Sequence, residues 1–162
     1  MRVGISGHQN IQPESAVAWL EAAIREALAT QRASVGVSSL AAGADQIFAT
    51  VVLEMGLDLA VVTPCIGYES SFENEESKAR FIRLNDRARF HHLMDFPSPS
   101  EQAFLAAGKW IIDTSDSMIF IWDGRPARGL GGTADIVAYA RAKTVPFVHL
   151  NPTDSSIARH AP

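Results

Sequence analysis

The feature that most constrains the fold is a regular alternation of short apolar runs with longer segments of helical periodicity. Runs rich in Val, Ile and Leu predict strands at residues 2–6, 34–38, 57–63, 90–96, 117–122 and 146–150. Between them, apolar residues spaced three or four apart predict helices at residues 13–32, 44–55, 72–84, 100–114 and 133–143. This order predicts an α/β fold, in which a parallel sheet is wound with right-handed crossovers and carries helices on both faces.

Local signals support these elements. The run at residues 57–63 is nearly all apolar, as expected of a strand that is covered on both faces. Gly56 stands where a left-handed residue ends a helix, and Ser98 or Ser100 can cap the helix that follows them. We expect one three-layer domain at residues 1–152 and a polar surface tail at residues 153–162.

Composition excludes several classes of protein. The chain of 162 residues has one cysteine, Cys65, which excludes an internal disulfide framework and indicates a cytoplasmic protein. No apolar run approaches the length of about 20 residues that spans a bilayer. The net charge of −4 disfavours a nucleic-acid partner, because phosphate backbones attract clustered Lys and Arg. The spacing of His, Asp, Glu and Cys predicts no metal site.

Small, hydroxylated and glycine residues follow the predicted strands at their carboxyl ends. In a parallel sheet these ends lie at one edge, where ligands bind. We therefore expect a pocket for a nucleotide or nucleotide derivative, with no other cofactor assigned. Its expected residues are Ser6, Gly7, His8, Ser39, Gly43, Asp45, Thr63, Pro64, Asp123, Gly124, Gly129, Gly131, Gly132 and Thr133.

The most specific part of this pattern is the glycine-rich loop that precedes the helix beginning at Thr133. Glycine allows a close approach of backbone to ligand, and a helix N-terminus offers unpaired N–H groups to an anion. Gly131, Gly132 and Thr133 are therefore expected to hold a phosphate, with Arg125 and Arg128 flanking the loop. A flexible crossover loop with a capped helix is the alternative that this segment alone leaves open.

Three blocks of the sequence resemble the SLOG superfamily. They are Val3–His8, Leu40–Asp45, and a third that combines Trp110–Asp116, Trp122–Gly124 and Gly131–Asp135. The superfamily comprises Rossmann-like nucleotide-binding domains related to the Lonely Guy phosphoribohydrolases and to DNA-processing protein A. The resemblance implies a single Rossmann-like domain with a mostly parallel sheet, which binds a nucleotide at the Gly-Gly-Thr helix start.

One departure from the Lonely Guy pattern concerns its catalytic glutamate. If Gly132 and Thr133 match the Gly-Thr pair of Pro-Gly-Gly-x-Gly-Thr-x-x-Glu, the glutamate position is Ile136. Asp135 lies one residue earlier, about 100° away around the helix. The resemblance therefore supports phosphate binding more than cleavage of an N-glycosidic bond.

The sequence does not decide whether the chain is an enzyme. The first hypothesis is a module that binds a small-molecule nucleotide. The alternative is a nucleotide N-glycosidase, a phosphoribohydrolase or a deoxyribosyltransferase-like enzyme, with Asp123, Asp135 or Asp45 as its carboxylate. DNA binding like that of DNA-processing protein A is disfavoured by the acidic balance, and a membrane partner is not expected. A homo-oligomer is left open.

Overall fold

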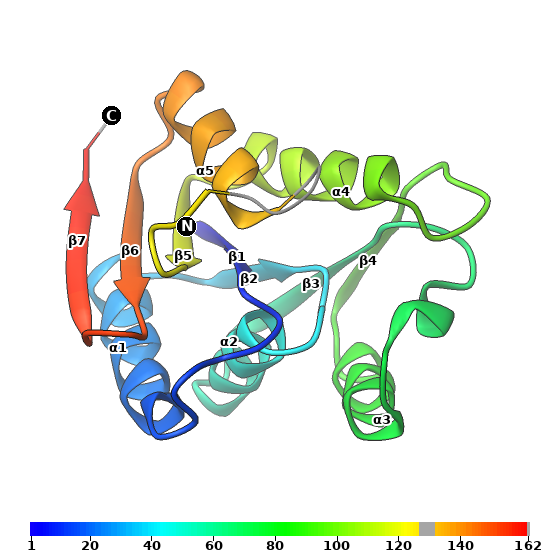
Figure 1. The fold of residues 1–162 in the computed structure, drawn as a ribbon, viewed down its shortest axis with the longest axis horizontal. Helices are drawn as coiled ribbons and strands as arrows, with labels where there is room; N and C mark the ends of the chain where they lie inside the picture. The colour runs from blue at the N-terminus through cyan, green and yellow to red at the C-terminus, as the bar shows by residue number, and fades with distance from the viewer. Residues whose placement is uncertain (127–131, 162) are drawn as a thin grey trace.

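The computed structural model describes residues 1–126 and 132–161, which form one sheet between two layers of helices (Figure 1). The strands are β1 (Arg2–Gly7), β2 (Val35–Ser38), β3 (Asp58–Thr63), β4 (Phe90–Leu93), β5 (Ser117–Ile121), β6 (Phe147–Asn151) and β7 (Ser156–His160). The helices are α1 (Ala16–Thr30), α2 (Ala44–Glu54), the short 3-10 helix η1 (Tyr68–Ser71), α3 (Glu75–Asn85), α4 (Glu101–Asp113) and α5 (Thr133–Ala142).

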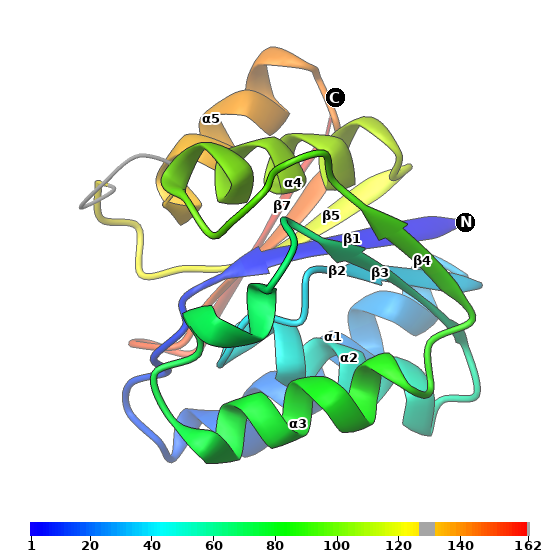
Figure 2. The same cartoon turned by 90° about the vertical axis from the view of Figure 1, so that its right-hand side faces the viewer.

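The sheet has the strand order β4-β3-β2-β1-β5-β6-β7. Strands β1 to β6 are parallel, and β7 is antiparallel to β6. Helices α1, α2 and α3 cover one face, whereas α4 and α5 cover the other (Figures 1 and 2). The predicted fold class, a Rossmann-like three-layer domain with a mostly parallel sheet, is confirmed.

Strand β3 shows why an apolar run marks a central strand. Leu59 and Val61 point into the core under α1, α2 and α3. Ala60 and Val62 point into the separate core under α4 and α5. Because successive side chains of a strand alternate between faces, a strand that is covered on both sides must be apolar throughout.

The predicted helix signals have the expected geometry. Gly56 follows α2 with a φ of +70°. Of the two candidate caps before α4, Ser100 is the cap, and its hydroxyl accepts a hydrogen bond from Ala103 N at 3.1 Å. Local sequence signals therefore coincide with these two helix ends.

The segment expected to be a surface tail contains β7, a strand that the sequence analysis did not predict. Its side chains are mostly exposed, so its sequence lacks the apolar alternation of a strand with one buried face. Backbone pairing with β6, from Asn151↔Ser156 to Phe147↔His160, holds it at the edge of the sheet. The boundary at residue 152 stays a prediction.

Within the described residues, no helix is long and apolar enough to cross a membrane.

Candidate functional site

The strand order creates a crevice between β1 and β5. From β1 the chain passes through α1 and α2 to strands on one side, and it returns through α4 to β5 on the other side of β1. The loops that leave β1 and β5 therefore diverge to opposite faces of the sheet. Such a switch point is where parallel α/β sheets bind ligands.

His8 and Asp123 meet at this switch point. His8 follows β1 and Asp123 follows β5, and His8 Nε2 lies 3.1 Å from Asp123 Oδ1. A proton on Nε2 lets the ring donate to the carboxylate, whereas an unprotonated Nε2 accepts from Asp123 N at 3.3 Å. The backbone joins the same loops, since His8 N donates to Ile121 O at 3.0 Å.

The pKa of Asp123 is lowered from its ordinary value of 3.8. Burial, the largest single influence, raises this pKa. It is outweighed by hydrogen bonds from the Arg125 backbone and His8 and by the charges of the His8 and Arg125 side chains. Asp123 is therefore an ionised hydrogen-bond acceptor at neutral pH.

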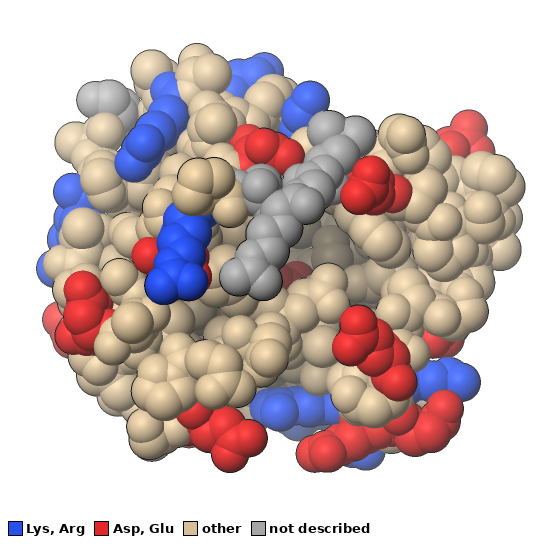
Figure 3. All heavy atoms as spheres, in the orientation of Figure 1, with Lys and Arg blue, Asp and Glu red and all other residues tan. Residues whose placement is uncertain are grey.

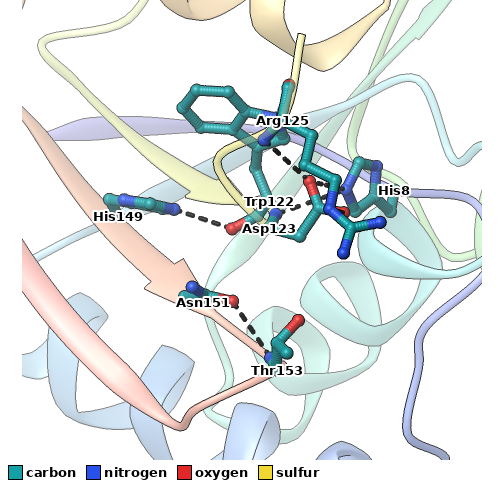
Figure 4. Close-up of polar contacts among 7 residues, drawn as sticks. All are labelled: His8, Trp122, Asp123, Arg125, His149, Asn151 and Thr153. Carbon is teal, nitrogen blue, oxygen red and sulfur yellow. Dashed lines mark hydrogen bonds and ion pairs between the residues drawn. The ribbon is translucent and has the colours of Figure 1, made fainter. Parts of the chain in front are cut away.

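The turn after β5 is held by a small network of hydrogen bonds (Figure 4). Arg125 N donates to Asp123 Oδ1 at 3.0 Å, and Trp122 Nε1 donates to Arg125 O at 2.8 Å. His149 Nε2 lies 2.7 Å from Trp122 O. This network fixes the backbone of Arg125. The side chain of Arg125 is 74 % exposed, and its Nε lies 3.8 Å from Asp123 Oδ2.

These loops line a groove of about 370 Å³ at the carboxyl edge of the sheet. His8, Asp123 and Arg125, all considered in the sequence analysis, lie in its wall together with Asn10, Gln12, Pro13, Pro152 and Thr153. None of these last five residues was predicted as a site residue; Pro152 and Thr153 follow β6 at the same edge. Applying the strand-exit argument to residues 146–150 would have found them.

Asp45 lies at the start of α2, where its carboxylate is engaged by the β2–α2 loop. Its Oδ2 accepts hydrogen bonds from Ser38 Oγ at 2.9 Å and Ser39 N at 3.0 Å. The residue is only 6 % exposed, and burial raises its pKa to about 6 against the opposing effect of these donors. The Asp45 carboxylate thus accepts hydrogen bonds that N–H groups of this loop would otherwise donate to a phosphate.

Two of the predicted glycines are required by packing between loops. A Cβ on Gly43, which has a φ of +75°, would lie 2.2 Å from Gln9 O. A Cβ on Gly7 would lie 2.5 Å from Ala44 Cβ. The absence of side chains here allows the β1 exit to cross the start of α2, where Ala44 N donates to His8 O at 3.0 Å.

The start of α5 is described from Gly132 onward, so Gly129 and Gly131, like Arg128, lie outside the described residues. Gly132 is the N-cap of α5, and Thr133 and Asp135 are half-buried in its first turn. Ile136, at the position of the Lonely Guy glutamate, is 3 % exposed. A Cβ on Gly108 would lie 2.6 Å from Ile136 Cδ1, so this position belongs to the packed contact between α4 and α5.

The other predicted residues lie along the same edge. Ser6 is in β1 opposite Phe120, and Thr63 ends β3, where its carbonyl accepts from Met94 N at 2.9 Å. Pro64 is buried, and Gly124 has a φ of +84° with open space around it. Their place at the edge is as predicted, and their part in binding stays a prediction. Among the described residues, no group of His, Cys, Asp and Glu could hold a metal ion.

Charge is distributed unevenly over the molecule. Acidic side chains gather around the start of α3, whose first turn contains Glu75 and Glu76, whereas basic residues lie further along the helix (Figure 3). The groove, by contrast, combines the anion of Asp123 with the cation of Arg125, an imidazole and two amides. The net charge of the chain therefore does not describe the local charge of this site.

The strand order and the helices on both faces define a Rossmann-like α/β protein, with a candidate site at the switch point. Solved structures with this fold include DNA processing protein A from Helicobacter pylori, whose reported single-stranded DNA binding mode is described as unique. That chain aligns at 21% identity and a TM-score of 0.66, over 95% of this chain and 70% of its own. DNA processing protein A from Streptococcus pneumoniae aligns at 16% identity and a TM-score of 0.64, over 91% of this chain and 49% of its own.

At these identities the likeness concerns the fold. No family model matches the sequence, and no curated protein does. The present chain spans about half the length of the pneumococcal protein.

Two expectations from the sequence are wrong in the light of these neighbours. A small-molecule nucleotide was expected as the ligand, and nucleic acid was considered an improbable partner. Proteins of this fold include one that binds single-stranded DNA. The expectation against nucleic acid came from the net charge of −4, which sums over the whole surface, including the acidic residues around the start of α3, whereas binding depends on the charges that line the contact.

Proposed function

We propose that this chain binds single-stranded DNA across the groove at the carboxyl ends of β1, β5 and β6. The groove lies at the switch point of a sheet that is shared, over nearly the whole chain, with a single-stranded-DNA-binding protein. The observation that carries the proposal is the composition of the groove. Its walls offer hydrogen-bond donors and acceptors on fixed loops rather than an enclosed pocket for one small ligand.

Arg125 is the residue we assign to a phosphate. Its backbone is fixed by Asp123 and Trp122, while its guanidinium extends into solvent at the edge of the groove. A guanidinium binds phosphate oxygens with two parallel N–H bonds, and it is the residue type most suited to this contact. One well-placed arginine offsets an unfavourable net charge because salt screens charges more distant than about 10 Å.

His8, Asn10 and Gln12 are the residues we assign to bases and sugars. The bases of a single strand expose their hydrogen-bonding edges, which the paired bases of a duplex do not. Amide and imidazole side chains both donate and accept, so they match such edges without demanding one sequence. The proposal therefore favours single-stranded over double-stranded DNA.

Within the SLOG superfamily, we infer a place beside DNA processing protein A rather than among the Lonely Guy enzymes. The buried Ile136 supports this inference, since a catalytic carboxylate at that position would lie inside the contact between α4 and α5.

Fluorescence anisotropy tests the proposal directly. A labelled single strand of about 20 nucleotides, long enough to cover one such site, should bind, and a duplex of the same sequence should bind at least several-fold more weakly. Binding should weaken as salt rises, because phosphate contacts release counterions. Equal affinity for the duplex would refute the assignment of His8, Asn10 and Gln12 to bases. A flat anisotropy with the single strand at low salt would refute the proposal as a whole.

A further inference from the structure

Strand β4 is an open edge of the sheet, at the opposite end from β7 (Figures 1 and 2). All four of its residues, Phe90–Leu93, are exposed. Phe90 is 45 % exposed and Leu93 is 56 % exposed. The strand itself contains no Lys, Arg, Asp, Glu or Pro, which are the residues that usually protect an edge strand from pairing.

The backbone groups on this edge have a definite position. Thr63 pairs with Leu93, and its carbonyl accepts from Met94 N at 2.9 Å. In a parallel pair, alternate residues bond to one neighbour. The N–H and C=O groups of His91 and Leu93 are consequently directed away from β3, toward the open edge.

The charges that flank β4 are opposite at its two ends. Arg89 precedes the strand and Asp95 follows it, and both are exposed. Such a segment is complementary to itself in an antiparallel arrangement, because the basic end of one copy meets the acidic end of the other. A two-fold axis through the pair, normal to the sheet, produces this arrangement.

We propose that β4 pairs antiparallel with β4 of a second copy of this chain, centred on His92. In that register His91 of each copy faces Leu93 of the other. The outward N–H and C=O groups of these residues, two residues in each copy, then bond across the axis. Arg89 of one copy then faces Asp95 of the other. Phe90 of one copy faces Met94 of the other on the side of the sheet that α4 covers.

The side chains on that side fit a second copy. His92 is stacked on Trp110 of α4, with ring centroids 4.3 Å apart and planes at 11°. Beside this pair lies a cavity of about 210 Å³ whose lining includes Phe90, His92 and Trp110. The pairing covers the exposed ring of Phe90 and closes this cavity. With only four residues in β4, we expect a weak, concentration-dependent dimer.

Sedimentation velocity on the full chain over a range of concentrations tests the proposal. The wild-type chain should shift from monomer to dimer as concentration rises. Arg89→Glu and Asp95→Arg should each require at least tenfold more protein for the same shift, because each opposes like charges across the axis. The double variant Arg89→Glu/Asp95→Arg should regain dimerisation, since it restores opposite charges in exchanged positions.

A matched control lies on the other edge of the sheet. Arg159 of β7 is an exposed arginine with one ion pair, to Glu26, as Arg89 has one to Asp58. Arg159→Glu should leave dimerisation unchanged. Circular dichroism checks that each variant folds, and an additional variant, Leu93→Lys, tests the edge without altering the ion pairs. A wild-type chain that stays monomeric at every concentration overturns the proposal. So does a double variant that stays as weak as the single ones, or an Arg159→Glu variant that alone abolishes the dimer.

Discussion

At the scale of single residues, Asp45 and Asp123 have contrasting environments, although each lies shortly after the carboxyl end of a strand. Asp45 is buried, and its pKa is raised to about 6, whereas hydrogen bonds and positive charges lower the pKa of the accessible Asp123. The sequence suggested both as candidate acids. In the structure, Asp45 is hydrogen-bonded within the β2–α2 loop, whereas Asp123 lies in the wall of the groove.

The raised pKa of Asp45 predicts an unusual pH dependence of stability. The folded protein binds the Asp45 proton more tightly than the unfolded chain does, since the pKa rises from 3.8 to about 6 on folding. This contribution to stability is complete below pH 3.8, declines as pH rises toward 6, and is absent above it. Its size is at most about 3 kcal/mol.

Urea unfolding at several pH values from 4 to 7 measures this contribution. Asp45→Asn removes the titrating group, so the difference in unfolding free energy between wild type and variant should change across this range. Asp86→Asn, at an exposed carboxylate after α3, is the control and should give a constant difference. A constant difference for Asp45→Asn as well would contradict the buried, protonatable Asp45.

Arg125 should contribute to DNA affinity through its side chain alone. Arg125→Ala retains the backbone bonds to Asp123 and Trp122, so the turn should keep its shape. We expect affinity for single-stranded DNA to fall by about tenfold and the slope of log K against log salt to become smaller by roughly one. Arg83→Ala removes the same charge from exposed α3 and should change neither quantity. Equal effects of the two variants would mean that charge acts without a defined site.

At the scale of elements, the crossing of the β1 exit over the start of α2 depends on Gly43. Gly43→Ala should destabilise by roughly 2–4 kcal/mol, from both its positive φ and the clash with Gln9 O. Gly56→Ala is the matched control, because Gly56 also has a positive φ but open space around it. It should cost only about 1 kcal/mol. Thermal unfolding of both variants separates the two causes, and equal losses would show that the clash is absent.

Ile136 fills the contact between α4 and α5. Ile136→Glu places a carboxylate in the space beside Gly108 and should destabilise by about 3–5 kcal/mol, whereas Ile136→Val should cost about 1 kcal/mol. Chemical denaturation measures both. A stable Ile136→Glu variant would indicate that this position opens to solvent and that the packing described here is wrong.

The elements were largely predictable because their signals are local. The alternation of apolar runs and helical stripes marked β1 to β6 and α1 to α5 but not η1, and Gly56 and Ser100 marked two helix ends. Strand β7 was missed because its exposed side chains leave only backbone pairing to define it. The roles of Gly7 and Gly43 were also hidden, since a glycine needed for chain crossing and one needed for ligand approach look the same in sequence.

The candidate site was predictable in place and less so in composition. Parallel topology brought His8 and Asp123 to one edge, as expected from their positions after β1 and β5. Asn10, Gln12, Pro152 and Thr153 were not predicted, and the β6 exit contains no glycine that would mark the last two. The burial of Asp45 depends on a loop that folds around it, and its part in binding stays a prediction. These features are set by three-dimensional contacts rather than by spacing.

At the scale of the whole molecule, the net charge of −4 misled the inference about partners. One group of acidic residues lies where α3 begins, on the side of the sheet away from α4 and α5 (Figure 1). The groove combines the cation of Arg125 and the anion of Asp123 with several neutral polar groups, and this local composition bears on the proposed DNA binding more than the net charge does.

In the proposed complex, single-stranded DNA lies in the groove at the β1–β5 switch point. Titration of the ¹⁵N-labelled chain with a short single strand, followed by amide chemical shifts, tests it most directly. We expect the largest shifts at Asn10, Gln12, Asp123, Arg125 and Thr153, with α3 unaffected. Shifts concentrated elsewhere on the molecule, or none at saturating DNA, would contradict it.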